Sequence, residues 1–408
     1  MEMISKSPRD RQTSSVTTPS KLWTFRNPVA VWFGCGCIPE AASTFSWRRM
    51  LLITSPGMVR RGTADTVMKA WSGVEWEVCA EVEPNPRLDA LDQLADRLQG
   101  CRAEGMVGLG GGSAVDSAKI LGVLLGMKGK FSLHRHFREG QPLPQGGSIP
   151  VIAIPTTSGT GSEVTPFATV WDLKESRKYS LSGDPLFPQA ALLAPELTYG
   201  LPWEVTLATG MDALCQAMES IWNRHASPIT LELARHAARE AWQVMRQGNA
   251  VLDSPELRER LMKASLLAGL AISQTRTALC HSISYPITAR FGVPHGMACG
   301  FVLPAVLRFN AVADDGRLQE LALDLGFTSA ATLADGLESW LKEMGIPALL
   351  TRHGVTPDKL ISLVPEMITP GRADNNLRRA EGDDVAEILR NYLPIFLPEG
   401  LAAGSYGH

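Results

Sequence analysis

Two histidines, His281 and His295, stand fourteen positions apart in the stretch CHSISYPITARFGVPHG, residues 280–296. The chain has only 8 histidines, and a histidine on its own is more often a core or surface residue than a ligand. Imidazole is nevertheless the commonest side-chain ligand of transition metals in proteins. The pair therefore indicates a metal site only if oxygen ligands from elsewhere in the chain converge on it.

The stretch TGMDALCQAMES, residues 209–220, is a source of such ligands. Asp212, Gln216 and Glu219 follow one another at i, i+4 and i+7, so on a helix they share one face. Taken alone, such a trio is most often a polar helix face. Combined with two imidazoles, one carboxylate and one amide oxygen form a donor set that suits Fe(II), with Zn(II) as the alternative. The candidate metal ligands are Asp212, Gln216, His281 and His295.

A glycine-rich stretch, GMVGLGGGSAVDSAK at 105–119, runs from an apolar segment into a helical one. Glycines allow a tight turn there, and the free N–H groups at the start of the helix attract a phosphate. The alternative is a turn that merely reverses the chain, because the strict GxGxxG pattern is absent. The candidate phosphate-binding residues are Gly110, Gly111, Gly112 and Ser113, with Asp116 as a further cofactor-binding candidate.

A second loop of this kind, PTTSGTGSEVTPFA at 155–168, follows another apolar segment. Loops at the carboxyl ends of parallel strands are where ligands bind in open α/β sheets. Thr156, Thr157 and Thr160 could donate hydrogen bonds to a ribose, a phosphate or a nicotinamide carboxamide. Two such loops in one domain favour a dinucleotide.

The distribution of apolar residues predicts two domains behind a disordered leader at 1–20. Short apolar runs alternate with helical ones through 21–203, which is typical of a parallel sheet covered by helices. The expected strands lie at 48–56, 74–82, 105–113 and 148–157, and the expected helices between them at 63–71, 87–100 and 114–126. From 204 to 408 the runs are long and helical, at 206–225, 230–247, 255–275, 329–344, 357–368 and 382–392.

Composition narrows the possible functions. A net charge of −3 without a basic stripe gives no reason to expect nucleic-acid binding. The seven cysteines contain no CxxC pair, which favours a reducing, cytoplasmic setting over a disulfide framework. No stretch reaches the ~18 uninterrupted apolar residues of a membrane span, so we expect no membrane association.

Four separated motifs carry a resemblance to a known family. GLGGGSAVDSAK, PTTSGTGSE, TGMDAL…AMES and PHG occur in the order and spacing of the iron-containing alcohol dehydrogenases, and the likeness extends over residues 22–395. The resemblance implies an N-terminal Rossmann-like domain that binds NAD(H) or NADP(H), and an all-α metal-binding domain. It also implies a homodimer and the reversible reduction of an aldehyde to an alcohol.

The resemblance also implies residue roles, and the sequence departs from the family at three of them. Asp212, His281 and His295 match family metal ligands, whereas Gln216 stands where the family has a histidine. Tyr285 replaces a histidine that is common near the substrate and could still relay a proton. Ser55 replaces an aspartate that engages the adenosine ribose and repels a 2′-phosphate, so we expect NADPH to be accepted, with Arg60 or Arg61 as its counter-charge.

Arg290 and Arg276 each lie five residues before one of the two metal-site histidines, which makes them candidates for binding an anionic substrate. The alternative for each is an ordinary ion pair with a neighbouring carboxylate. Within the family, the stretches CHSISYPITARFGVPHG and MESIWN most resemble reductases that convert phosphonoacetaldehyde to 2-hydroxyethylphosphonate. The expected substrate is therefore a small anionic aldehyde.

Three alternatives remain at the level of the sequence. The first is a general short-chain alcohol or semialdehyde dehydrogenase. The second is a lyase or synthase related to dehydroquinate synthase, which also uses NAD and a metal. The third is a metal-free pseudoenzyme that binds a nucleotide, which the replacement of a histidine by Gln216 makes conceivable.

Overall fold

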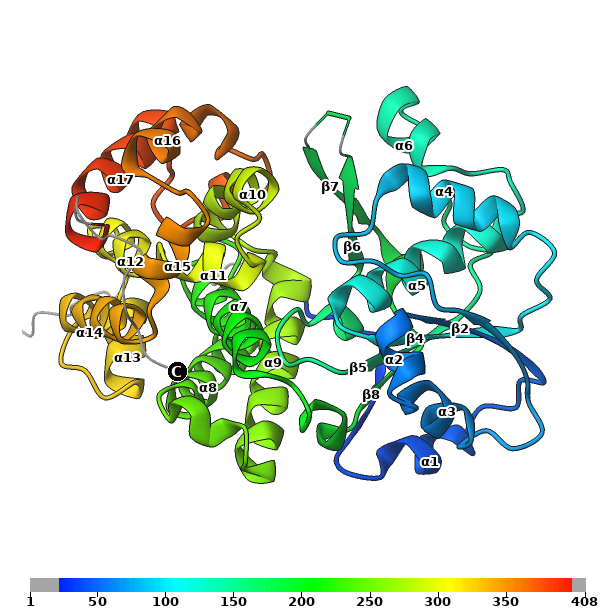
Figure 1. Ribbon diagram of the computed structural model, residues 1–408. Helices are drawn as coiled ribbons and strands as arrows, with labels where there is room; N and C mark the ends of the chain where they lie inside the picture. Colours follow the sequence, from blue (N-terminus) through cyan, green and yellow to red (C-terminus); the bar gives the residue numbers. More distant parts are fainter. Residues whose placement is uncertain (1–21, 173, 176, 398–408) are drawn as a thin grey trace, which may run out of the picture.

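The computed structural model describes residues 22–397 except 173 and 176, so the leader expected at 1–20 lies outside the described residues. The first half contains a six-stranded parallel sheet with the strand order β1-β8-β5-β4-β2-β3 (Figure 1). The strands are β1 Ala30–Phe33, β2 Arg49–Thr54, β3 Glu75–Cys79, β4 Gly105–Gly110, β5 Val151–Pro155 and β8 Ala190–Leu193. This confirms the predicted parallel α/β domain.

Helices cover both faces of the sheet because the central strands are apolar on both sides. In β2, Leu51 and Ile53 pack toward α4 and α5, whereas Met50 and Leu52 pack toward α1, α2 and α3 on the opposite face. These helices are α1 Cys37–Ala42, α2 Pro56–Arg60, α3 Thr63–Met68, α4 Leu88–Arg97, α5 Gly112–Gly126 and α6 Leu133–Glu139.

The order of strands reverses at the β2–β4 pair. From β2 the chain moves outward to β3 and then returns to form β4 on the other side of β2. The carboxyl ends of two strands at such a switch point leave a crevice in which open α/β sheets bind ligands. Ser55, which follows β2, and the glycine turn after β4 both lie at this edge.

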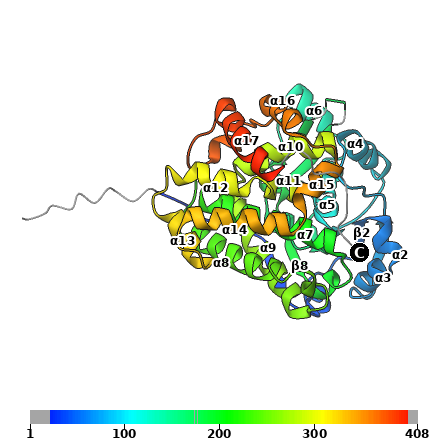
Figure 2. The same cartoon turned by 60° about the vertical axis from the view of Figure 1, so that its left-hand side comes forward.

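The second half is helical, as predicted (Figure 1, Figure 2). Its central helix, α7, is almost entirely buried because Met211, Leu214 and Met218 face other helices rather than water. Helices α8, α13 and α14 lie together along one side in both views. The helices are α7 Trp203–Ile221, α8 Pro228–Met245, α9 Pro255–Thr275, α10 Leu279–Phe291, α11 His295–Gly300, α12 Leu303–Ala311, α13 Arg317–Asp324, α14 Ala330–Glu343, α15 Ile346–Arg352, α16 Pro357–Ser362 and α17 Gly382–Phe396.

An antiparallel hairpin, β6 Phe167–Asp172 and β7 Arg177–Ser182, is absent from the sequence prediction. It rises from the α/β half beside the gap between the two halves, and β7 approaches α10 (Figure 1). Below it, Val164 and Leu193 of the first half pack on Met262 and Leu266 of α9. No helix among the described residues is both long and apolar enough to span a lipid bilayer.

Candidate active site

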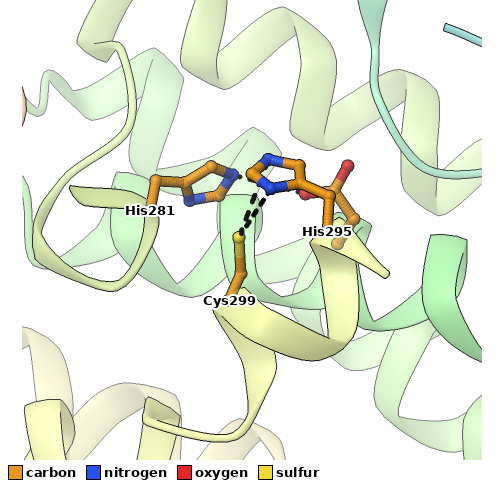
Figure 3. Close-up of side chains that lie close together, drawn as sticks. His281, His295 and Cys299 are labelled. Carbon is orange, nitrogen blue, oxygen red and sulfur yellow. Dashed lines mark hydrogen bonds and ion pairs between the residues drawn. The ribbon is translucent and has the colours of Figure 1, made fainter. Parts of the chain in front are cut away.

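Three segments of the helical half bring the expected metal ligands together. Asp212 lies in the middle of α7, His281 in the first turn of α10, and His295 at the first position of α11. Nε2 of His281 lies 3.3 Å from Oδ1 of Asp212, and the two imidazole rings are 5.5 Å apart (Figure 3). Residues from distant parts of the chain therefore share one buried site.

Glu219, one helical turn beyond Gln216, holds His281 from behind. Its Oε2 lies 2.6 Å from Nδ1 of His281, and its two oxygens also accept the N–H groups of Ala278, Cys280 and His281. Carboxylates in this position fix the tautomer and the orientation of a metal-binding histidine. The sequence identified Glu219 only as a member of a polar face, so this function was missed.

At the centre, Oε1 of Gln216 is buried without a hydrogen bond from the described residues, and the buried Oδ1 of Asp212 has only its 3.3 Å contact with Nε2 of His281. Gln216 is 3% exposed, and its Nε2 lies 3.4 Å from the carbonyl oxygen of Thr160 in the opposite half. A buried acceptor without a donor is costly unless a cation or a ligand meets it. The donor set therefore fits a divalent ion, as the sequence predicts.

The electrostatics of the two histidines differ. Burial by itself lowers the pKa of His281, but Cys299, Glu219 and Asp212 beside it hold the pKa well above its ordinary value. Burial, aided by the charge of Lys178, lowers the pKa of His295 well below its ordinary value. His295 is therefore neutral and offers a lone pair on one ring nitrogen.

The glycine turn after β4 has the shape of a phosphate cradle. Gly110 has a φ of 147°, and a Cβ there would lie 2.8 Å from Ala114. A Cβ on Gly112, at the start of α5, would lie 2.6 Å from the methyl group of Thr160. Glycine is thus required for the two loops to approach each other, and the N-terminus of a fifteen-residue helix faces the gap between them.

The threonines of the second loop have different positions. Thr160 lines the cavity, and the side chain of Thr157 would lie 3.5 Å from a Cβ added to Gly111. Thr156 is buried at 1% exposure, and its N–H donates to the carbonyl of Gly110, which connects the second loop to the glycine turn. Ser55 caps α2 at the switch point with no side-chain capping bond.

Asp116 has both carboxylate oxygens engaged within the protein. Oδ1 accepts a hydrogen bond from the hydroxyl of Ser162, and Oδ2 accepts one from the N–H of Thr169 at 2.8 Å. Asp116 lines the cavity, but these bonds tie α5 to the second loop and to β6. Asp116 therefore positions these segments, and its contact with the cofactor, expected from the sequence, stays a prediction.

One cavity of about 450 Å³ connects the cradle to the expected metal ligands. Gly112 and Ser113 line one end of it, and Asp212, Gln216, His281, Tyr285 and His295 line the other. The hairpin forms a wall. A nucleotide whose phosphates rest on α5 would thus reach the histidines through a continuous space, in keeping with the tendency of ligand sites to lie between domains.

Three cations face this cavity: Lys178 from β7, Arg276 from the turn before α10, and Arg372 from the segment before α17. Nζ of Lys178 lies 3.4 Å from Nε2 of His295 and 4.1 Å from the ring centre of Tyr285. Burial by itself raises the pKa of Tyr285, but Lys178 and Arg372 bring it below its usual value. Sequence analysis anticipated Arg276 and missed Lys178 and Arg372, since nothing in the local pattern predicts that a hairpin lysine will reach a histidine on α11.

The structure does not bring Arg290 to the cavity, which corrects the expectation that it binds substrate. Its guanidinium forms a two-pronged ion pair with Glu366, at 2.6 and 3.1 Å, on the exposed side of α10. The position between two site histidines was misleading because α10 turns Arg290 away from the face that carries His281.

Comparisons with known proteins agree with this geometry. Residues 28–195 match the family described as iron-containing alcohol dehydrogenase, and residues 206–393 match the C-terminal domain of the same family. The chain is 32% identical to a sulfoacetaldehyde reductase of Bilophila wadsworthia, over 87% of this chain and 95% of that protein. It is 33% identical to a phosphonoacetaldehyde reductase of Streptomyces viridochromogenes, over 84% and 89% of the two chains.

A solved structure is also similar. The sulfoacetaldehyde reductase of Bifidobacterium kashiwanohense, in complex with NAD+, superimposes with a TM-score of 0.85 at 31% identity, covering 93% of this chain and all of that one. The matched families and the shared fold favour an oxidoreductase over a lyase or a nucleotide-binding pseudoenzyme. This chain belongs to the iron-containing alcohol dehydrogenase family and is an oxidoreductase that interconverts aldehydes and alcohols.

Proposed function

We propose that this protein reduces a short aldehyde carrying a phosphonate or sulfonate group to the corresponding primary alcohol, with a nicotinamide cofactor as reductant. The observation that carries the proposal is the set of three cations, Lys178, Arg276 and Arg372, on the wall of the cavity beside His281 and His295. The names of two relatives, a sulfoacetaldehyde and a phosphonoacetaldehyde reductase, support the same substrate class.

No carboxylate in the described part of the chain neutralises these three cations. Among residues 22–397 without 173 and 176, none of the three forms an ion pair with a carboxylate. Burial and the nearby charge of Arg372 lower the pKa of Arg276, so the two guanidinium groups repel each other when the cavity holds no anion. A tetrahedral anion would relieve that repulsion and accept several charge-assisted hydrogen bonds.

The backbone at Arg276 supports a functional role. Its φ of 62° and ψ of 178° are unusual for a residue with a side chain. Two hydrogen bonds hold this conformation. The N–H of Arg276 donates to the carbonyl of Ile272, and the side-chain amide of Asn223 donates to the carbonyl of Arg276. Strain of this kind is typical of binding sites, where it aims a side chain at a ligand.

Asp212, His281 and His295 are the residues that would hold a divalent cation, and the buried oxygens at the centre, Oδ1 of Asp212 and Oε1 of Gln216, fit one. When bound, the metal would polarise the aldehyde carbonyl and the nicotinamide would supply a hydride. The cations would fix the far end of the substrate, so that its carbonyl faces the histidines. Tyr285, which stacks on His295 at 6.0 Å, would donate the proton that the product oxygen needs, directly or through water.

We also propose that NADPH is accepted alongside NADH. Ser55 puts a neutral side chain at the switch point, and Arg60 and Arg61, both exposed, follow within two turns. Without a carboxylate at that position, a 2′-phosphate meets no repulsion. Comparing kcat/KM for the two cofactors tests this, and a hundredfold preference for NADH would contradict it.

The substrate proposal is tested with an aldehyde panel. We expect kcat/KM to be highest for phosphonoacetaldehyde and sulfoacetaldehyde, lower for the carboxylate succinic semialdehyde, and lowest for uncharged butanal. Inorganic sulfate or phosphate should inhibit competitively against the charged aldehydes. Equal values for butanal and the phosphonate would refute the anion site while leaving the oxidoreductase assignment intact.

A further inference from the structure

We infer that Cys299 is a ligand of the divalent metal, in the place left by the family histidine that Gln216 replaces. The inference rests on the metal site proposed above and deepens it. Its tests measure metal affinity and the absorption spectrum of the bound metal, so they can fail without affecting the substrate proposal.

The geometry singles out this thiol. Cys299 follows His295 by four residues on α11, so both side chains lie on one face of the helix (Figure 3). Its Sγ lies 3.8 Å from each ring nitrogen of His295. One ligand atom from each of Asp212, His281, His295 and Cys299 lies within 4.8 Å of the other three.

Two of these separations are close to the edges of a tetrahedral site. Metal–nitrogen and metal–oxygen bonds of about 2.0–2.1 Å and metal–sulfur bonds of about 2.3 Å put neighbouring ligand atoms roughly 3.3–3.6 Å apart. The observed 3.3 Å between His281 and Asp212 and 3.8 Å between Cys299 and His295 need only small adjustments. Asp212, His281, His295 and Cys299 thus restore a set of four protein donors.

The other nearby thiols do not meet the same conditions. Cys215 lies 3.9 Å from Nδ1 of His281, the nitrogen that faces Glu219, and so stands on the opposite side of the ring from Asp212. Cys280 is grouped with Cys215 and Glu219, but the oxygens of Glu219 are already occupied by N–H groups and by His281. Cys215 is therefore a matched control for the loss of a buried thiol beside the site.

Gln216 is the competing ligand. It is buried with a free Oε1, but an amide oxygen is a harder and weaker donor than a thiolate for Fe(II), Co(II) or Zn(II). Binding through Cys299 displaces the Sγ proton to solvent, so one additional proton is released per metal bound. The negative charge of the thiolate offsets the positive charge of the metal ion. As a soft donor, the thiolate also shifts metal selectivity toward Zn(II) and Co(II) over Mn(II) and Mg(II).

The test is to load the metal-stripped full-length protein with Co(II) and record its absorption spectrum. We expect a thiolate-to-cobalt charge-transfer band in the near ultraviolet in the wild type and in Cys215→Ser, and none in Cys299→Ser. In competition with a chromophoric chelator, Cys299→Ser should bind Zn(II) at least about a hundredfold more weakly, because removing an outer-shell partner alone costs roughly 10- to 100-fold. Gln216→Leu should retain the band.

The wild-type spectrum decides the question even if Cys299→Ser fails to fold. A protein that binds one Co(II) without a charge-transfer band overturns the inference and leaves the Asp212, His281 and His295 site standing. Loss of the band in Cys215→Ser but not in Cys299→Ser overturns it as well. A wild type that binds no Co(II) or Zn(II), yet reduces aldehydes after chelation, would remove the metal from the proposed function altogether.

Discussion

Nδ1 of His281 lies 2.6 Å from Oε2 of Glu219, and this contact decides which nitrogen of the ring faces Asp212. Glu219 is fully buried, and it also accepts three backbone N–H groups from the start of α10. One carboxylate on α7 therefore fixes both the first turn of α10 and the orientation of the histidine that this turn carries.

The substitution Glu219→Gln is expected to weaken metal binding without removing any ligand. The glutamine side chain would keep one acceptor oxygen but would lose the charge that favours the Nδ1–H tautomer of His281. Outer-shell partners of this kind contribute about 10- to 100-fold to metal affinity, which chelator competition with Zn(II) measures. Glu366→Gln, which breaks only the exposed ion pair with Arg290, is the control and should bind Zn(II) as the wild type does.

Replacing Arg372 with methionine is expected to damage the use of charged aldehydes selectively. Hydrogen bonds to charged groups are worth about 1.5–3 kcal/mol, or roughly 10- to 150-fold, so KM for phosphonoacetaldehyde should rise by about that factor. Since butanal has no anion to bind, its kcat/KM should change by about twofold or less. Arg290→Met, on the outer side of α10, should leave both substrates unaffected; equal losses for both substrates in Arg372→Met would contradict the anion site.

A methyl group at Gly112 is expected to disrupt nucleotide binding. The added Cβ would lie 2.6 Å from the methyl group of Thr160, so either α5 or the second loop must move. Calorimetric titration should show a rise of about tenfold or more in Kd for the dinucleotide, since contacts to an anion at a helix N-terminus depend on close approach. Gly100→Ala, where a Cβ meets nothing within 4 Å, should bind the dinucleotide normally.

The buried carboxyl of Glu163 should make stability depend on pH. Burial raises its pKa from 4.5 to about 7. Because the folded pKa lies above the unfolded value, the stability that the protonated group contributes is fully present below pH 4.5 and is lost as pH rises to about 7. Glu163→Gln cannot ionise, so at pH 8 its free energy of unfolding should exceed that of the wild type by up to ~3 kcal/mol, at about 1.4 kcal/mol for each pH unit between the two pKa values.

The nearby Lys119 reduces the expected gain in stability. Glutamine also removes the attraction between Glu163 and the buried Lys119, whose own pKa burial lowers to about 8, and this offsets part of the gain. Thermal midpoints at pH 4.5 and pH 8 provide the measurement, with the exposed Glu343→Gln as control. Curves for Glu163→Gln and wild type that stay parallel across this range would show that the carboxyl does not titrate in the folded protein.

The sequence alone determined the α/β and helical halves and the glycine turn after β4, and the resemblance to the family singled out Asp212, His281 and His295, which the structure brings together. These features depend on local patterns: alternating apolar runs specify buried parallel strands, three- and four-residue spacing specifies the face of α7, and glycines specify a close approach. The stripe formed by Met211, Leu214 and Met218 is such a pattern, and all three residues are buried in the core.

Only the tertiary structure decided which charged residues meet the cavity. Arg290 lies between two site histidines in the chain, yet its position on α10 directs it outward to Glu366, whereas Lys178 comes from a hairpin more than a hundred residues away. Cys299 likewise is a ligand candidate only because α11 places it close to Asp212, His281 and His295. Contacts between distant segments depend on how whole helices and strands pack, and the local sequence around each residue does not contain that information.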